Sequence, residues 1–249
     1  MNRFFISHPN ITNNIITMED REQVHHINSV LHLKVKEPVL IFDKEGNEYN
    51  CVISELGERV ALEVNSKRIK NKSGNGIILT IACAIPKKSR FDDIVEKLTQ
   101  LGVTRIIPLL TERVVVKLDR EKEGLRLGRW RKIAQSAAEQ SQRNDIPEIT
   151  EIKDFKELVS LSSSFDLKLI PTLFGIRKGI KDVFSPLGKE SKDNFTILVL
   201  IGPEGDFTDD EINIAKCAGF IPITLGDLVL RVETAAIAVA SFARFYAHD

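Results

Sequence analysis

Residues 76–110, GIILTIACAIPKKSRFDDIVEKLTQLGVTRIIPLL, carry the pattern that decides the fold of most of this chain. An apolar run at 76–85 is followed by apolar residues at helical spacing over 91–101, and then by a second apolar run at 103–110. Gly102 stands directly after the last periodic residue, as is typical of a helix C-terminus. The stretch therefore predicts a strand, a helix and a parallel strand.

The same alternation of strands and helices continues to the C-terminal end of the sequence. Thr208 and Glu211 have the T-x-x-E spacing of a capping box, which predicts that a helix begins at Thr208. Further predicted elements are a long helix at 125–142, strands at 167–172, 195–202 and 221–225, and a helix at 234–247. Such alternation predicts an α/β domain with a mostly parallel sheet covered by helices.

The first 70 residues have a different pattern, with short strands expected at 38–43, 48–56 and 59–69. We interpret them as a small β barrel or sheet. The polar, glycine-containing segment KNKSGNG at 70–76 is the best linker candidate. The sequence therefore predicts one domain at 1–72 and another at 73–249.

Composition excludes several classes of protein. Thirty-five basic and 35 acidic residues balance to a net charge of zero, so total charge does not indicate nucleic acid, although opposed patches remain compatible with it. Cys51, Cys83 and Cys217 lie far apart, which favours free thiols over a disulfide framework or a zinc site, and no metal is expected. We see neither a signal peptide nor a membrane-spanning run, and we expect a cytoplasmic protein.

Three loops that follow predicted strands are the candidate ligand site, because ligands of open α/β sheets bind at the carboxyl ends of strands. The loops are 171–175, 201–207 and 225–235, and neither a G-x-G-x-x-G motif nor a P-loop is present. Residues 204–233 contain seven acidic and two basic residues, a net charge of −5, which would repel a polyphosphate. A cationic ligand such as S-adenosylmethionine would be favoured.

An alternative interpretation of the same residues stays open. Gly202 and Gly205 would then only turn the chain, and Asp209, Asp210 and Glu211 would stabilise the N-terminus of the following helix rather than contact a ligand.

Four motifs carry a resemblance to a known family: EKLTQLGVTRIIPLLTERVVVK at 96–117, AAEQSQRNDIPEI at 137–149, LIGPEGDFTDDEI at 200–212 and LGDLVLRVETAAIAVA at 225–240. Together they resemble the ribosomal RNA small subunit methyltransferase E family, and the likeness covers essentially the whole chain. The resemblance implies a C-terminal SPOUT domain with a trefoil knot, an N-terminal PUA-like RNA-binding β barrel, and a homodimer. It also implies methylation of N3 of a 16S rRNA uridine, with S-adenosylmethionine as cofactor and free rRNA or the assembled small subunit as substrate.

The resemblance assigns roles to individual residues. The cofactor-binding positions are Leu173, Gly202, Glu204, Gly205, Leu225, Gly226, Leu230, Arg231, Thr234 and Ala235. Arg231 is our candidate for stabilising the uridine anion, since a guanidinium donates two parallel hydrogen bonds to a base edge. Its place between the apolar LVL and ETAA suggests that it points into the pocket. Glu233 is a candidate proton acceptor, although pairing with Arg231 or capping the last helix is an equal alternative. Glu139, Gln140 and Arg143 match another family motif and could complete the site across a dimer interface.

Candidate RNA contacts come from a locally basic stretch and from the family motifs. Residues 86–143 contain fourteen basic and eight acidic residues, a net charge of +6, which suits a polyanionic partner. A solvated helix face is the alternative for Lys122, Arg126 and Arg129. The candidates are Arg3, Lys87, Lys88, Arg90, Arg113 and Arg143, with Phe4, Phe5 and Phe174 as aromatic residues that stack on a base or simply pack.

The chain departs from the family pattern at a few positions. Asp206 stands where the family usually has a glycine, His32 where an arginine is common, and Lys36-Glu37 where a glycine-containing turn is usual. Two alternative functions stay open: methylation at another RNA position, and RNA binding without catalysis by a protein that retains the pocket.

Overall fold

The computed structural model describes residues 1–69, 77–86, 90–114, 120–185 and 194–246. The chain forms two compact units, residues 1–73 with 138–146, and residues 74–137 with 147–249. The second unit therefore lacks a segment that the predicted domain 73–249 included. The linker predicted at 70–76 lies outside the described residues.

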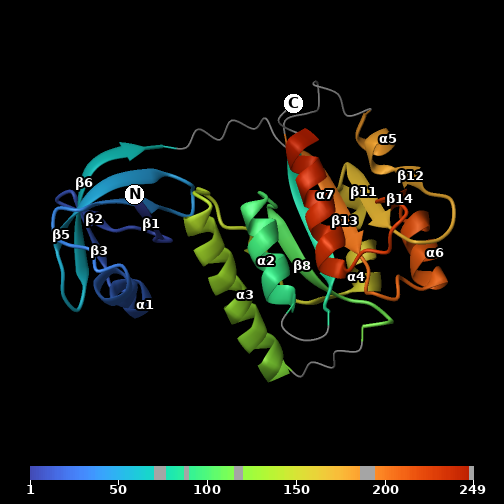
Figure 1. Ribbon diagram of the computed structural model, residues 1–249, viewed down its shortest axis with the longest axis horizontal. Helices are drawn as coiled ribbons and strands as arrows, with labels where there is room; N and C mark the ends of the chain where they lie inside the picture. The colour runs from blue at the N-terminus through green and yellow to red at the C-terminus, as the bar shows by residue number, and fades with distance from the viewer. Residues whose placement is uncertain (70–76, 87–89, 115–119, 186–193, 247–249) are drawn as a thin grey trace. The chain divides into compact units, whose positions relative to one another are not determined.

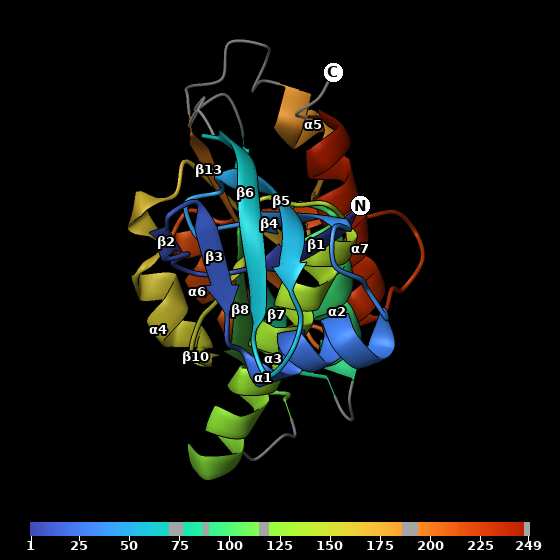
Figure 2. The ribbon, with the colours of Figure 1, turned by 90° about the vertical axis from the view of Figure 1, so that its left-hand side faces the viewer.

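The first unit is built on a mixed six-stranded sheet. In sheet order, its strands are β1 (Asn2–Phe5), β4 (Pro38–Phe42), β5 (Glu48–Glu55), β6 (Val60–Arg68), β3 (Ile15–Met18) and β2 (Ile11–Thr12). β1 runs parallel to β4, and the other neighbouring pairs are antiparallel. Figure 2 shows the broad strands β3, β5 and β6, with α1 (Arg21–His25) below them. A π-helical turn, His26–Val30, follows α1.

Residues 138–146 belong to the first unit because they pack on its sheet. Ala138 and Ile146 join an apolar cluster with Leu40 and Phe42. The Glu139 Oε1 atom accepts a hydrogen bond from the N–H of Phe5 at 3.0 Å. These contacts are made by residues more than ninety positions apart in the sequence, which is why local patterns assigned the segment to the second domain.

The second unit contains a sheet in which all pairs of described strands are parallel. The order is β10 (Lys153–Asp154), β8 (Arg105–Leu110), β7 (Ile77–Ala84), β13 (Phe195–Ile201), β11 (Leu167–Pro171), β14 (Ile221–Thr224) and β12 (Lys178–Gly179), with β9 (Glu148–Ile149) also on β8. The predicted α/β class is confirmed. The trefoil knot stays a prediction.

Helices cover both faces of this sheet, as a sheet of buried parallel strands requires. α2 (Arg90–Gln100) packs beside α7 (Val232–Tyr246), and α7 contacts β7 and β13 (Figure 1). On the other face, α4 (Phe155–Ser160) packs with α6 (Asp209–Cys217) in a cluster that includes Leu198 and Leu200 of β13. The remaining helices are α3 (Arg120–Gln140), the 3-10 turn Ser162–Ser164 and α5 (Ile180–Phe184). Within the described ranges, no helix is both long and apolar enough to span a bilayer.

Local sequence signals predicted several helix ends. The capping box of α6 is confirmed: the Thr208 side chain accepts from the Glu211 N–H, and the Glu211 carboxylate accepts from the Thr208 N–H at 2.9 Å. Gly102 has a φ of 84°, the left-handed conformation of a helix C-terminus. α3 begins five residues before the predicted start at 125, because its first turns are polar and have no apolar periodicity. It ends at Gln140, two residues before the predicted end, and Gln142 has a φ of 59°.

Candidate functional site

The carboxyl ends of β11, β13 and β14 frame a hollow in the second unit. These strands are neighbours in the sheet, so the loops that follow them meet at one edge. The hollow holds about 540 Å³ of space free of protein atoms, part of it open to solvent. It brings together seven of the residues predicted to bind a cofactor: Leu173, Gly202, Glu204, Leu225, Gly226, Leu230 and Ala235.

Two glycines in the wall are required for different reasons. Gly226 has a φ of 120°, which side chains rarely adopt, and an added Cβ there would meet no atom within 4 Å. At Gly202 an added Cβ would lie 2.9 Å from the Phe207 ring, which belongs to the buried core. Gly202 is therefore kept small by internal packing, and not only by the ligand space that the sequence suggested. Gly205 is predicted but is not in the wall, and its Cβ would make an ordinary 3.6 Å contact with Arg113.

Asp206 connects two of the loops. The residue is 5% exposed, and its Oδ2 atom accepts hydrogen bonds from the Thr172 hydroxyl at 2.8 Å and the Leu173 N–H at 2.7 Å. Oδ1 accepts from the N–H of Phe207 at 2.8 Å. The backbone of Asp206 is left-handed, with a φ of 62°, which explains the glycine usual at this position, and aspartate is one of the residues that tolerates it. This departure from the family pattern thus adds a link between the 171–175 and 201–207 loops.

Arg113 holds the same loop from the other side. Its Nη1 atom donates to the carbonyl oxygens of Gly205, Asp206 and Phe207, the last at 3.4 Å. The Glu211 carboxylate, which caps α6, also accepts from the N–H of Glu112 at 2.9 Å. Arg113 is exposed and binds these loop carbonyls through one nitrogen, and its predicted contact with RNA stays a prediction.

The charge of the wall is smaller than the sequence window suggested. Among the described residues that line the hollow, the charged ones are Glu204, Asp206 and Arg177, a net charge of −1 in place of −5 over 204–233. Asp209 and Asp210 are exposed in the first turn of α6 and do not line the hollow. Glu211 is buried as a helix cap. The alternative interpretation of these last three carboxylates, as residues that serve the helix, agrees with these positions.

Comparisons with known proteins agree with this architecture. The RNA methyltransferase domain family matches residues 74–244, and the RNA methyltransferase PUA domain family matches residues 19–62. The chain is 30% identical over 215 residues to ribosomal RNA small subunit methyltransferase E of Bacillus subtilis, an alignment that covers 86% of this chain and 84% of that protein. The chain belongs to the ribosomal RNA small subunit methyltransferase E family.

Solved structures of methyltransferase E relatives have the same fold. A Legionella pneumophila methyltransferase in complex with the cofactor S-adenosylmethionine has a TM-score of 0.86 and 30% identity, with 98% of this chain and 96% of that chain covered. A ribosomal RNA small subunit methyltransferase E from Neisseria gonorrhoeae bound to S-adenosylmethionine has a TM-score of 0.83 and 29% identity, covering 98% and 97%. The N-terminal mixed sheet and the C-terminal parallel sheet are thus the fold of this family.

Arg231 and Glu233, the candidate catalytic pair of this methyltransferase E family member, lie at the start of α7. The Arg231 side chain is 67% exposed, and its Nη1 atom lies 4.0 Å from Glu233 Oε1. Leu230 and Val232 on either side line the hollow, whereas Arg231, Glu233 and Thr234 do not. The expected orientation of Arg231 into the hollow is therefore not what the structure has, and its catalytic role stays a prediction.

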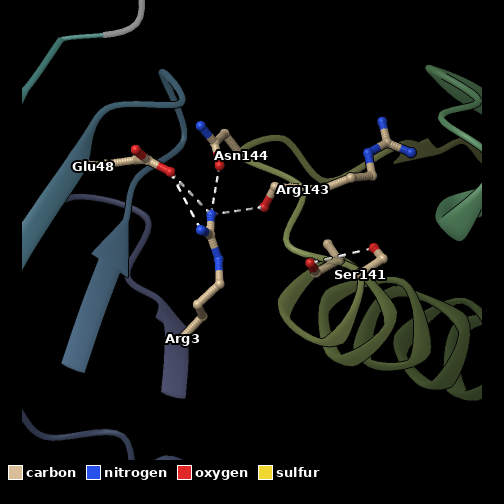
Figure 3. Close-up of polar contacts among 6 residues, drawn as sticks. Arg3, Glu48, Ser141, Arg143 and Asn144 are labelled. Atoms are coloured by element: carbon tan, nitrogen blue, oxygen red, sulfur yellow. Dashed lines mark hydrogen bonds and ion pairs between the residues drawn. The ribbon is translucent and has the colours of Figure 1, made fainter. Parts of the chain in front are cut away.

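Two predicted RNA contacts belong to an internal network of the first unit (Figure 3). The Arg3 side chain is 10% exposed and lies between Glu48 Oε1, at 3.3 Å, and the Asn144 side-chain oxygen. The Arg143 guanidinium points away from it and pairs with Asp145 at 2.7 Å, while its own side chain is 11% exposed. The Arg143 carbonyl accepts from Arg3 at 3.4 Å. These arginines fix residues 143–145 instead of presenting free guanidinium groups.

The other predicted RNA contacts have mixed outcomes. Lys87 and Lys88 lie outside the described residues, and Arg90 is described only as the first residue of α2. Phe4 is 3% exposed in the core of the first unit, and Phe5 packs on Phe42, so both fit the packing alternative. Phe174 is 70% exposed and stays available for stacking. Lys36, in the departing turn, has a φ of 74°, which explains the glycine usual there.

Sequence reasoning missed Thr172 as the partner of Asp206 and Arg177 as a wall residue. Arg177 lies two residues past the predicted end of the 171–175 loop, so a longer loop prediction would have included it. No local signal pairs Thr172 with a residue 34 positions away.

Proposed function

We propose that this chain transfers a methyl group from S-adenosylmethionine to N3 of a uridine in 16S rRNA. The family and the two relatives that contain S-adenosylmethionine support the proposal. The single observation that carries it is the hollow, because three separate loops, two of which bear family motifs, form one wall.

The residues of the wall fit a nucleoside that carries a sulfonium and an amino acid. Leu173, Leu225 and Leu230 offer apolar surface to an adenine ring, and backbone near Gly226 can approach a ligand because nothing fills the space beside its Cα. Glu204 supplies a negative charge on the same wall. These residues would hold the cofactor, which supplies an electrophilic methyl group when bound.

The protein's part in the reaction is to remove the N3 proton and to stabilise the uridine anion, since that proton is mostly retained at neutral pH. Arg231 is the proposed stabiliser. Its exposure at the rim allows a base that comes from solvent to receive two hydrogen bonds from one guanidinium. Glu233, at 21% side-chain exposure beside it, is the proposed proton acceptor.

We further propose that residues 1–72 bind RNA and that 73–249 bind the cofactor, in a homodimer that works in the cytoplasm on 16S rRNA or the small subunit. Four large apolar side chains in the two loops beside the hollow support the dimer: Phe174, Ile176, Leu228 and Val229 are each at least 70% exposed. Such side chains are depleted from surfaces that face only water. Light scattering coupled to size exclusion tests this, and a monomer at micromolar concentration would contradict it.

Calorimetry with S-adenosylmethionine, followed by methylation of small subunits from cells that lack the gene, tests the proposed function. We expect saturable binding and one 3-methyluridine in 16S rRNA by mass spectrometry. No binding at millimolar cofactor would favour a non-catalytic RNA-binding protein. A methyl group on another nucleotide would keep the enzyme and refute the N3 assignment.

A further inference from the structure

Arg177 is the one basic residue in the wall of the hollow among the residues that the structure describes. It follows the exposed residues Phe174, Gly175 and Ile176 and directly precedes β12. Its Nη1 atom donates a hydrogen bond to the carbonyl oxygen of Thr172 at 3.1 Å. This bond closes the 172–177 loop, and the Thr172 hydroxyl is itself held by Asp206. The guanidinium is therefore fixed at the wall.

The charge of Arg177 is incompletely compensated by the protein. In the described part of the chain it makes no ion pair, and the Thr172 carbonyl is its single hydrogen-bond acceptor. A guanidinium has five N–H donors in a rigid fork, so four remain. The side chain is half-buried, and partial burial of a cation costs free energy that an anionic partner would offset. The wall thus has an unmet preference for an anion.

A methyl donor carries such an anion. The amino-acid end of S-adenosylmethionine has a carboxylate and an ammonium group of opposite charge, and the wall offers Arg177 and Glu204, also of opposite charge. The carboxylate is planar and has the geometry that a guanidinium fork binds with two parallel hydrogen bonds. A wall of acidic residues alone would attract the sulfonium but repel this carboxylate.

We propose that Arg177 is a specificity-determining residue that binds the carboxylate of the methyl donor. The inference rests on the proposed function of the hollow and deepens it. Arg177 then selects nucleosides that bear a complete amino acid over sulfonium nucleosides without the carboxylate.

The test compares two ligands by calorimetry: S-adenosylmethionine and its decarboxylated analogue, which keeps the sulfonium and the amine. The unmodified protein is expected to bind S-adenosylmethionine about 10- to 100-fold more tightly, the range for a hydrogen bond between charged groups. Arg177→Gln should lower the affinity for S-adenosylmethionine by that factor and leave the affinity for the analogue unchanged. Arg177→Lys keeps the charge but loses the guanidinium fork. Its affinity for S-adenosylmethionine should lie between those of the unmodified protein and Arg177→Gln.

Lys178→Gln is the matched control, because it removes the same charge from the next residue, which is exposed and does not line the hollow. It should bind both ligands as the unmodified protein does. Equal weakening of both ligands by Arg177→Gln would mean that Arg177 only shapes the loop, and would overturn the inference. If Arg177→Gln binds both ligands unchanged but has a raised KM for RNA, Arg177 contacts the RNA instead, and the inference is also overturned. If the unmodified protein binds neither ligand, the proposed function itself fails.

Discussion

Charged side chains hold both the 201–207 loop of the second unit and the 138–146 segment of the first. In the loop their partners are neutral groups, and in the segment one partner is a charged side chain. The loop is held by Asp206, which accepts from the backbone N–H of Leu173, and by Arg113, which donates to carbonyl oxygens of the loop itself. The segment is held by Arg3 of β1, which donates to Asn144 and pairs with a second, mostly buried charge, Glu48. Loss of a loop charge leaves only neutral groups without a partner. Loss of Arg3 leaves a carboxylate that is 14% exposed, and this is the costlier outcome.

The largest effect is expected for Arg3→Met. It should lower the free energy of unfolding by about 3–5 kcal/mol, the usual cost of removing one partner of a buried pair, as measured by urea denaturation. Arg3→Met combined with Glu48→Leu should recover most of this loss, because no buried charge is left. A loss below about 1 kcal/mol for the single variant would contradict the buried pair.

Asp206→Ala should cost about 2–3 kcal/mol, since three donors lose their acceptor and alanine is strained at a positive φ. Calorimetry should also show weaker binding of S-adenosylmethionine, because Leu173 loses its link to the loop. Asparagine keeps a hydrogen-bond acceptor and tolerates the left-handed backbone, so we expect a smaller loss of stability for Asp206→Asn. The loss for Asp206→Gly should lie between those of the alanine and asparagine variants. If Asp206→Gly matched the original protein in both measurements, the carboxylate would have no role beyond that of a glycine.

Gly202→Ala is expected to destabilise by about 1–3 kcal/mol, the cost of overpacking, as the new methyl group would overlap the Phe207 ring. Gly202→Ala with Phe207→Leu should regain stability in thermal unfolding, whereas Phe207→Leu alone creates a cavity. Failure of the pair to regain stability would indicate that Gly202 is needed for its backbone instead of for ring packing.

Arg231→Ala has the smallest expected effect on stability, about 0–1 kcal/mol, because its pair with Glu233 is long and exposed. Its effect on turnover should be large, about 100-fold, if it stabilises the uridine anion. Single-turnover methylation measures this, with cofactor affinity as the comparison that should fall less than the rate. An unchanged rate would remove Arg231 from the reaction.

Local signals predicted the elements of the second unit well. The βαβ unit around α2, the left-handed Gly102 and the capping box at Thr208 all depend on residues within a few positions of each other. The three candidate loops were also found, because strand ends can be read from apolar runs. The resemblance to the family then identified seven residues of one wall.

Contacts between distant residues could not be read in this way. Arg3 and Asn144 are 141 positions apart, and Arg113 and Gly205 are 92 apart. The basic composition around Arg113 and Arg143 suggested RNA, and it gave no sign that Arg113 binds loop carbonyls or that Arg143 pairs with Asp145. RNA contacts by these two arginines stay a prediction. The window charge of −5 misled for a similar reason, because most of those carboxylates do not reach the hollow.

The grouping of 138–146 with residues 1–73 has a consequence for how this protein can be divided. The first unit is discontinuous, so the chain passes between the units three times, near 73, 137 and 146. A protein fragment that ends at residue 73 would expose Leu40 and Phe42, and its Arg3 would lack Asn144 as a hydrogen-bond partner. A single proteolytic nick at any one of the three crossings would still leave the two units linked by the peptide connections at the other two.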